Sequence, residues 1–155
     1  MNSIYIEPQI KEDADNLSKI VYQQIKEHRY DDSDTSFKLD DKVYDQYKKA
    51  IKYLVSEGFI KEERAIGHKY PIKMRLTNPL YKSYICELTD DAAMLSKLTG
   101  IMNSMTEGEQ IRAADAREKG INLPLPIIRA VFELYEYKQD GIMSKTIGES
   151  LYIKN

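Results

Sequence analysis

The sequence is poor in the features that mark membrane, secreted and disulfide-bonded proteins. It holds a single cysteine, Cys86, so an internal disulfide framework is excluded and a reducing compartment is favoured. No apolar run is long enough to cross a bilayer, and residues 1–8 lack the basic and apolar regions of a signal peptide. Seven glycines and five prolines among 155 residues, with 42% hydrophobic residues, indicate a globular chain. We therefore expect a soluble, cytoplasmic protein that does not enter a membrane.

Residues with catalytic or metal-binding chemistry are equally scarce. The chain contains no HExxH, CxxC, GxGxxG or GxxxxGK[ST] pattern. His28 falls on the apolar face of an expected helix, where packing is the usual role. His68 falls at an expected hairpin tip, where exposure to solvent is usual. Cys86 lies in an apolar stretch typical of a core. The sequence therefore predicts a protein that is not an enzyme and that has no metal site and no cofactor.

Charge is unevenly distributed along the chain. Residues 1–40 hold five basic and nine acidic side chains, whereas residues 41–80 hold nine basic and five acidic ones. Residues 81–120 carry a net charge of −2 and residues 121–155 are balanced. One basic segment in an otherwise acidic chain indicates a surface that faces a polyanion, although a swing of this size can also arise by chance.

Hydrophobic periodicity predicts a helix–loop–helix–hairpin order in the first half. Apolar residues at helical spacing predict a helix over 10–28, followed by a loop. Residues 36–39 fit either a short strand or a weak helix. A second clear helix is expected over 41–57, ended by Gly58 in a conformation of positive φ. Alternation along 59–77, with a turn at Gly67-His68, predicts a β-hairpin with a basic outer face.

For the second half of the chain, the sequence pattern predicts three more helices and a smaller hairpin. Residues 80–88 are apolar, but their pattern does not assign a secondary structure to them. Helical spacing is clear over 93–105, and Thr106 to Glu109 match a capping box that would start a helix reaching Lys119. A helix from Pro126 to about Gln139 and a hairpin over 142–155 complete the chain. Because Gly58 and Gly141 each follow a long helix and precede a hairpin, the two halves share an architecture. The fold class expected is α+β, mainly α.

The stretch from Tyr47 to Glu63 carries a resemblance to a known fold family. Its cadence of Ala50, Leu54, Gly58, Phe59 and Ile60 resembles the junction between recognition helix and wing in winged helix-turn-helix proteins. The resemblance covers about residues 10–77, at the level of the fold, and names no subfamily. A second helix, usual in that family, is not evident between residues 31 and 39. A weaker resemblance over about 89–155 suggests two units in tandem, with domains at 1–80 and 81–155. The expected third helix of the second copy, 126–139, is mixed in charge and so is expected to pack or to dimerise rather than to read a DNA groove.

The resemblance implies a DNA-binding protein, a transcriptional regulator or a DNA-binding factor of the phage or plasmid type. The helix over 41–57 would enter the major groove of duplex DNA, with Gln46 and Lys49 at base edges and Lys42 and Lys52 near flanking phosphates. The wing over 59–77 would contact phosphates or the minor groove. Its candidate side chains are Arg64, His68, Lys69, Lys73 and Arg75.

An alternative is a winged helix that serves as a protein–protein assembly module without DNA. Twelve tyrosines and the acidic overall balance suit a protein partner. The fold family alone does not decide between these roles. A homodimer is expected by analogy with small regulators that bind paired half-sites.

Overall fold

The first part of the chain folds into three helices and a small sheet. A computed structural model describes residues 7–137, 141–146 and 149–154. The N-terminal unit, residues 8–76, contains in order α1 (Pro8–His28), β1 (Ser36–Phe37), α2 (Asp41–Gln46), α3 (Lys48–Ser56), β2 (Ile60–Glu63) and β3 (Lys73–Leu76). The segment over 36–39, open between strand and helix from the sequence, therefore contains a strand, at Ser36 and Phe37.

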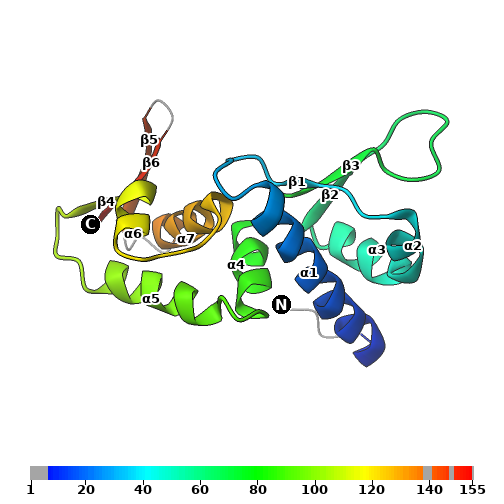
Figure 1. Ribbon diagram of the computed structural model, residues 1–155, viewed down its shortest axis with the longest axis horizontal. Coiled ribbons are helices and arrows are strands. Elements are labelled where there is room, and N and C mark those ends of the chain that lie inside the picture. The colour runs from blue at the N-terminus through cyan, green and yellow to red at the C-terminus, as the bar shows by residue number, and fades with distance from the viewer. Residues whose placement is uncertain (1–6, 138–140, 147–148, 155) are drawn as a thin grey trace.

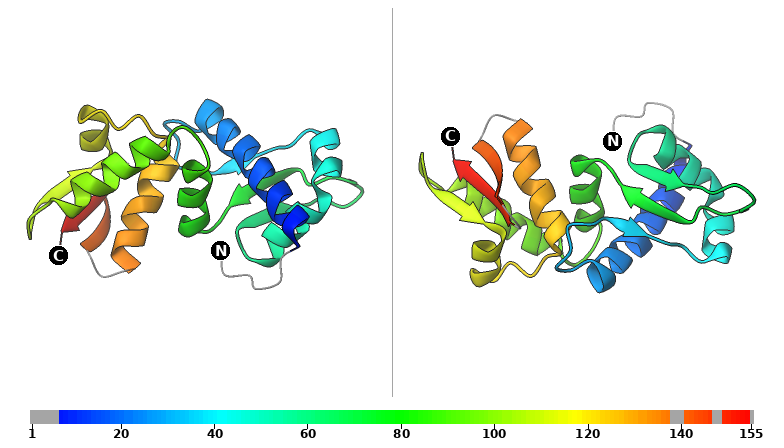
Figure 2. Two further views of the ribbon diagram at one scale, coloured as in Figure 1. Left: turned by 90° about the horizontal axis from the view of Figure 1, so that it is seen from below. Right: turned by 90° about the horizontal axis from the view of Figure 1, so that it is seen from above.

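The three strands form an antiparallel sheet in the order β1-β3-β2. Ser36 lies opposite Arg75, and Ile60 lies opposite Leu76. Side chains alternate across β3, so Met74 and Leu76 point into the core while Lys73 and Arg75 point to the outer face. Helices α1 and α3 pack against each other and lie on the inner face of this sheet (Figures 1 and 2). The layout is compatible with a winged helix.

The single helix predicted over 41–57 is wrong: the structure has two helices there. At Tyr47 the backbone leaves helical geometry (φ −106°, ψ 21°), which separates α2 from α3. The six residues of α2 thus form a separate helix within the stretch that periodicity merged into one element. The end of α3 was correctly predicted. Gly58 has φ +75°, and the amide of Phe59 donates to the carbonyl of Leu54, which ends the helix in a Schellman motif.

The second part begins with a helix that periodicity did not resolve. That helix, α4 (Pro79–Glu87), is capped by the Asn78 side chain, which accepts a hydrogen bond from the amide of Leu80. The C-terminal unit, residues 92–154, follows with α5 (Ala92–Asn103), β4 (Gln110–Arg112), α6 (Ala113–Glu118), α7 (Leu125–Tyr137), β5 (Gly141–Thr146) and β6 (Glu149–Lys154). The expected hairpin is present, while its turn at 147–148 and the expected helix end near Gln139 lie outside the described residues.

The helix predicted to start at the capping box Thr106–Glu109 is wrong over its first turns. Thr106 does donate to the Glu109 carboxylate, but Gly108 between them has φ +86°, so the segment is a turn. The next three residues form β4 because β6, some forty positions later in the sequence, supplies their pairing partner. Helix α6 starts only at Ala113, where Asp115 accepts a hydrogen bond from the amide of Arg112.

The two units share one order of elements. Each runs helix, strand, helix, helix, strand, strand, and each sheet places its last strand in the middle: β1-β3-β2 and β4-β6-β5. The shared architecture suggested by Gly58 and Gly141 is thus present in the topology. The fold as a whole is mainly α, with two small antiparallel sheets.

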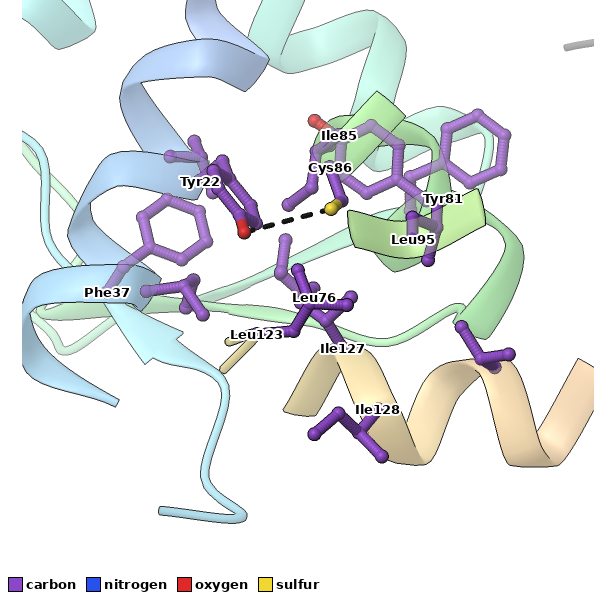
Figure 3. Close-up of a cluster of buried hydrophobic side chains, with 14 of the residues drawn as sticks. Tyr22, Phe37, Leu76, Tyr81, Ile85, Cys86, Leu95, Leu123, Ile127 and Ile128 are labelled. Atoms are coloured by element: carbon purple, nitrogen blue, oxygen red, sulfur yellow. Dashed lines mark hydrogen bonds between the residues drawn. The ribbon is translucent and has the colours of Figure 1, made fainter. Parts of the chain in front are cut away.

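A single hydrophobic core runs through both units. Helix α4 lies between them and contacts α1 on one side and α5 and α7 on the other (Figure 1). Figure 3 shows the result: Tyr22 and Leu76 of the N-terminal unit and Ile127 of the C-terminal unit surround side chains of α4, such as Ile85 and Cys86. Among the described residues, no helix combines the length and the apolar character needed to cross a bilayer.

Candidate functional site

The exposed face of α3 carries three neighbouring lysines, Lys48, Lys49 and Lys52. The opposite face buries Ala50, Ile51 and Leu54, an arc of about 100° at 3.6 residues per turn. Within the part of the chain that the structure describes, none of the three lysines has an ion-pair or hydrogen-bond partner for its side chain. This face is therefore a cluster of cations that the fold itself does not neutralise.

Of the α2 candidates, Lys42 and Gln46 are exposed. Gln46 is the last residue of α2, directly before the break at Tyr47, and so stands beside the lysines that open α3. The aspartates of α2 are exposed too, and Asp45 accepts a hydrogen bond from Tyr70. The cationic surface is thus densest on α3 and becomes mixed in charge on α2.

Sequence reasoning missed Lys48. With Ile51 taken as the centre of the apolar face, Lys48 lies only about 60° away and was not counted as exposed. In the structure Ile51 lies at one edge of the buried arc, because Ala50 and Leu54 are both on its other side. Lys48 then falls outside the arc. The i, i+4 spacing of Lys48 and Lys52 was the available signal.

The loop between β2 and β3, residues 64–72, holds the next three candidates. It projects beyond the sheet, away from α4 (Figure 1). His68 and Lys69 are exposed near its tip, where Gly67 has φ +85°, as the predicted turn requires. Arg64 is different, because its guanidinium is bound to the Tyr44 hydroxyl, the Glu62 carboxylate and the Lys69 carbonyl. Arg64 therefore holds the loop in place. Because its guanidinium is occupied by these contacts, Arg64 is less able to bind a partner.

Lys73 and Arg75 lie on the outer face of the sheet, on the far side from α3. Both pair with one carboxylate: Glu63 is 2.7 Å from Arg75 and 3.6 Å from Lys73. Period-two alternation correctly placed these two side chains away from the core. However, because α3 packs on the inner face, the sheet separates them from the α3 lysines. The structure thus brings the helix candidates together but places two of the strand candidates elsewhere.

Lys73 also lines an open pocket of about 340 Å³ between β1 and the end of α1. Arg29 in this pocket is paired with Asp32 and Asp34, so its charge is largely neutralised.

His28, expected to be packed, is instead exposed: its side chain retains 70% of its accessible surface. The apolar stripe of α1 is covered only as far as Ile25, and the last turn extends beyond the core.

Over the side chains that the structure describes, helix α7, the counterpart of α3 in the order of elements, has no comparable open face. Six of its buried residues span about 200° of the helix: Ile127, Ile128, Ala130, Val131, Phe132 and Tyr135. Packing against α4 and against the strands β5 and β6 covers most of this surface. The helix expected over 126–139, for which packing or dimerisation was predicted, is thus largely packed against its neighbours.

The side chains weighed for chemistry do not gather in one place. Burial raises the pKa of the Cys86 thiol to about 11, which keeps it protonated near neutral pH. The thiol is within hydrogen-bonding reach of the Tyr22 hydroxyl, at 3.7 Å, and of the Asp91 carbonyl, at 3.8 Å. Among the described residues, no group of three or more His, Cys, Asp or Glu side chains is placed to hold a metal ion.

Comparison with models of protein families, with curated proteins and with solved structures found no match to this chain.

Proposed function

We propose that the N-terminal unit is a winged helix that binds double-stranded DNA through the exposed face of α3 and the loop over 64–72, as a transcription regulator or a related DNA-binding factor. The observation that carries the proposal is the cluster of Lys48, Lys49 and Lys52, which lack intramolecular partners in the described part of the chain. Unneutralised lysines on one helix face suit a phosphate backbone, because binding releases the counterions of the polyanion.

The roles of the candidates follow from their placement. An α-helix fits the major groove of B-DNA, so α3 would lie there with its lysines toward phosphates and base edges. Gln46 carries the exposed amide at the start of this surface, and a Gln amide suits the edge of adenine. His68 and Lys69 would contact phosphates beside the groove. Lys73 and Arg75 would contribute through long-range attraction, since they face away from α3 and share Glu63.

The decisive experiment is the salt dependence of binding to duplex DNA. The wild-type chain should bind a duplex at low salt, with an affinity that falls linearly in a plot of log K against log salt. Replacing Lys48, Lys49 and Lys52 together by alanine should weaken binding by about ten- to a hundredfold and reduce the slope by about three. Exposed lysines outside this surface offer a matched control with the same change in charge: Lys19, Lys97 and Lys119.

The two triple variants separate a local contact from a general effect of charge. If the control variant loses as much affinity and slope as the α3 variant, the α3 surface is not the contact. Absence of binding to any duplex at low salt rejects the DNA proposal as a whole. Gln46→Ala should leave the salt slope unchanged but reduce the preference between duplex sequences, because base contacts carry sequence information and phosphate contacts do not.

A second function, assembly with a protein partner, is favoured by one observation. Ile66 at the tip of the loop is fully exposed and Ile72 at its base is 49% exposed, whereas large apolar side chains are mostly buried in this protein. Apolar residues on a projecting loop suit a protein interface. A partner-binding loop would be sensitive to Ile66→Ser and insensitive to salt, the reverse of the behaviour expected for DNA.

A further inference from the structure

The loop over 64–72 lies against α2 through a network of side-chain contacts. A loop of this length that projects from a hairpin is commonly mobile, because few contacts restrain its backbone. Here two tyrosines on different elements, Tyr44 of α2 and Tyr70 of the loop, pack edge to face with ring centroids 5.5 Å apart. The loop is thus joined to the element that immediately precedes α3.

The base of the loop is fixed by Tyr44. Its hydroxyl donates to the Glu62 carboxylate at 2.6 Å and accepts from the Arg64 guanidinium at 2.7 Å. Arg64 also reaches Glu62 directly and the carbonyl of Lys69 across the loop. Burial and the bond to Glu62 raise the pKa of Tyr44 to about 12, so the hydroxyl keeps its proton throughout the physiological range.

The far side of the loop is fixed by Tyr70. Its hydroxyl donates to the Asp45 carboxylate at 2.7 Å, and this bond raises the pKa of Tyr70. The ammonium of Lys69 lies over the Tyr70 ring, 5.3 Å from its centre. Tyr70 therefore joins Lys69, a cation of the loop, to Tyr44 and Asp45 of α2.

We propose that Tyr44 and Tyr70 are positioning residues, which hold the loop against α2 so that Lys69 and His68 stand at a fixed spacing from the α3 lysines. The inference rests on the proposed function, since it assigns these tyrosines a role in presenting the DNA-binding surface. Ordering a free loop on binding costs conformational entropy. A loop ordered before binding avoids that cost, and its cations meet the phosphates without rearrangement.

The first test needs no DNA. Tyr70→Phe removes only the hydroxyl that bonds Asp45, and it leaves the ring in place. Amide hydrogen exchange in the loop over 64–72 should accelerate severalfold in this variant. Tyr84→Phe is the matched control, because it removes a Tyr–Asp hydrogen bond of the same kind, from Tyr84 to Asp15 at 2.6 Å, on the α4–α1 side of the molecule. Loop exchange in Tyr84→Phe should equal that of the wild type.

The second test is a double-mutant cycle in duplex binding with the full chain. Tyr70→Phe should weaken binding by up to about tenfold, the range that one hydrogen bond permits. Because the loss acts through the loop, it should largely disappear in a Lys69→Ala background. In a Lys49→Ala background it should persist in full, since that contact does not depend on the loop.

The outcomes separate the two proposals. Unchanged loop exchange in Tyr70→Phe, or equal losses of affinity in the Lys69→Ala and Lys49→Ala backgrounds, overturns the positioning role while DNA binding stands. If the wild-type chain binds no duplex, the DNA proposal fails and the positioning role fails with it. The exchange measurement then still shows whether the tyrosines hold the loop.

Discussion

The two units of this protein have the same order of elements and the same order of strands, yet their third helices differ in how much of their surface is buried. Helix α3 buries an arc of about 100° and exposes its lysines, whereas α7 buries about 200° and contributes six residues to the core. The difference arises from α4, which packs along α7 but leaves the outer face of α3 uncovered. A shared topology therefore does not imply a shared function, because function depends on which helix face reaches solvent.

Polar contacts join the two units in addition to the shared hydrophobic core. Arg117 of α6 donates hydrogen bonds to the Asp31 carboxylate, the carbonyl of Tyr30 and the carbonyl of Leu123, and its guanidinium stacks 4.3 Å from the Tyr30 ring centre. The loop after α1 is thus tied to the C-terminal unit. On the other side of α4, Asp91 accepts from Tyr22 and pairs with Lys26 of α1.

The largest expected effect tests the buried state of α7. Phe132 is 0% exposed, and Phe132→Ala should lower the free energy of unfolding by about 3–5 kcal/mol, since it leaves a cavity in the core. On α3, Lys52→Ala should change it by less than about 0.5 kcal/mol. Urea unfolding of both variants measures the contrast. Similar values for the two would mean that α7 is as open as α3.

The next effect tests the contacts by which Arg117 joins the two units. Arg117→Ala should cost about 2–3 kcal/mol, because charged hydrogen bonds to a carboxylate and two carbonyls are lost. Arg117→Lys keeps the charge but not the planar fork, so it should recover only a minor part of that loss. Unfolding followed by tyrosine fluorescence and by circular dichroism should remain one transition in the wild type and begin to separate in Arg117→Ala. Full recovery by lysine would show that charge alone maintains these contacts.

The smallest effect compares how α3 and α6 end. Gly58 and Gly120 both have positive φ, +75° and +89°, at the ends of these helices. Alanine at either position should cost about 1–2 kcal/mol, since an L side chain disfavours this conformation. A Cβ would meet open space at Gly58 and the end of the flexible Lys97 side chain at Gly120, so the two costs should be close. A much larger cost at Gly120, measured by thermal unfolding, would show that Lys97 is held rigidly there.

Much of the local structure could be predicted from the sequence. The stripe of α1, the glycine after α3, the turn at Gly67 and the alternation along β3 each follow from neighbours within a few residues, where spacing reports directly on structure. The exposed lysines Lys49 and Lys52 were found in the same way. Lys48 was not, because its exposure depends on where the buried arc is centred, and that is decided by what packs onto the helix.

The sequence by itself determined the helical spacing, the basic segment over 41–80 and the glycines that end helices, because these are properties of contiguous residues. Only the tertiary structure decided the rest. The break at Tyr47 and the turn at Gly108 interrupt stretches whose local pattern was helical, and β4 exists because β6 returns beside it. The placement of Lys73 and Arg75 behind the sheet follows from the packing of α1 and α3 on its inner face, and the placement of α7 in the core follows from its packing against α4. Burial of this kind joins residues distant in the sequence, so no local pattern records it.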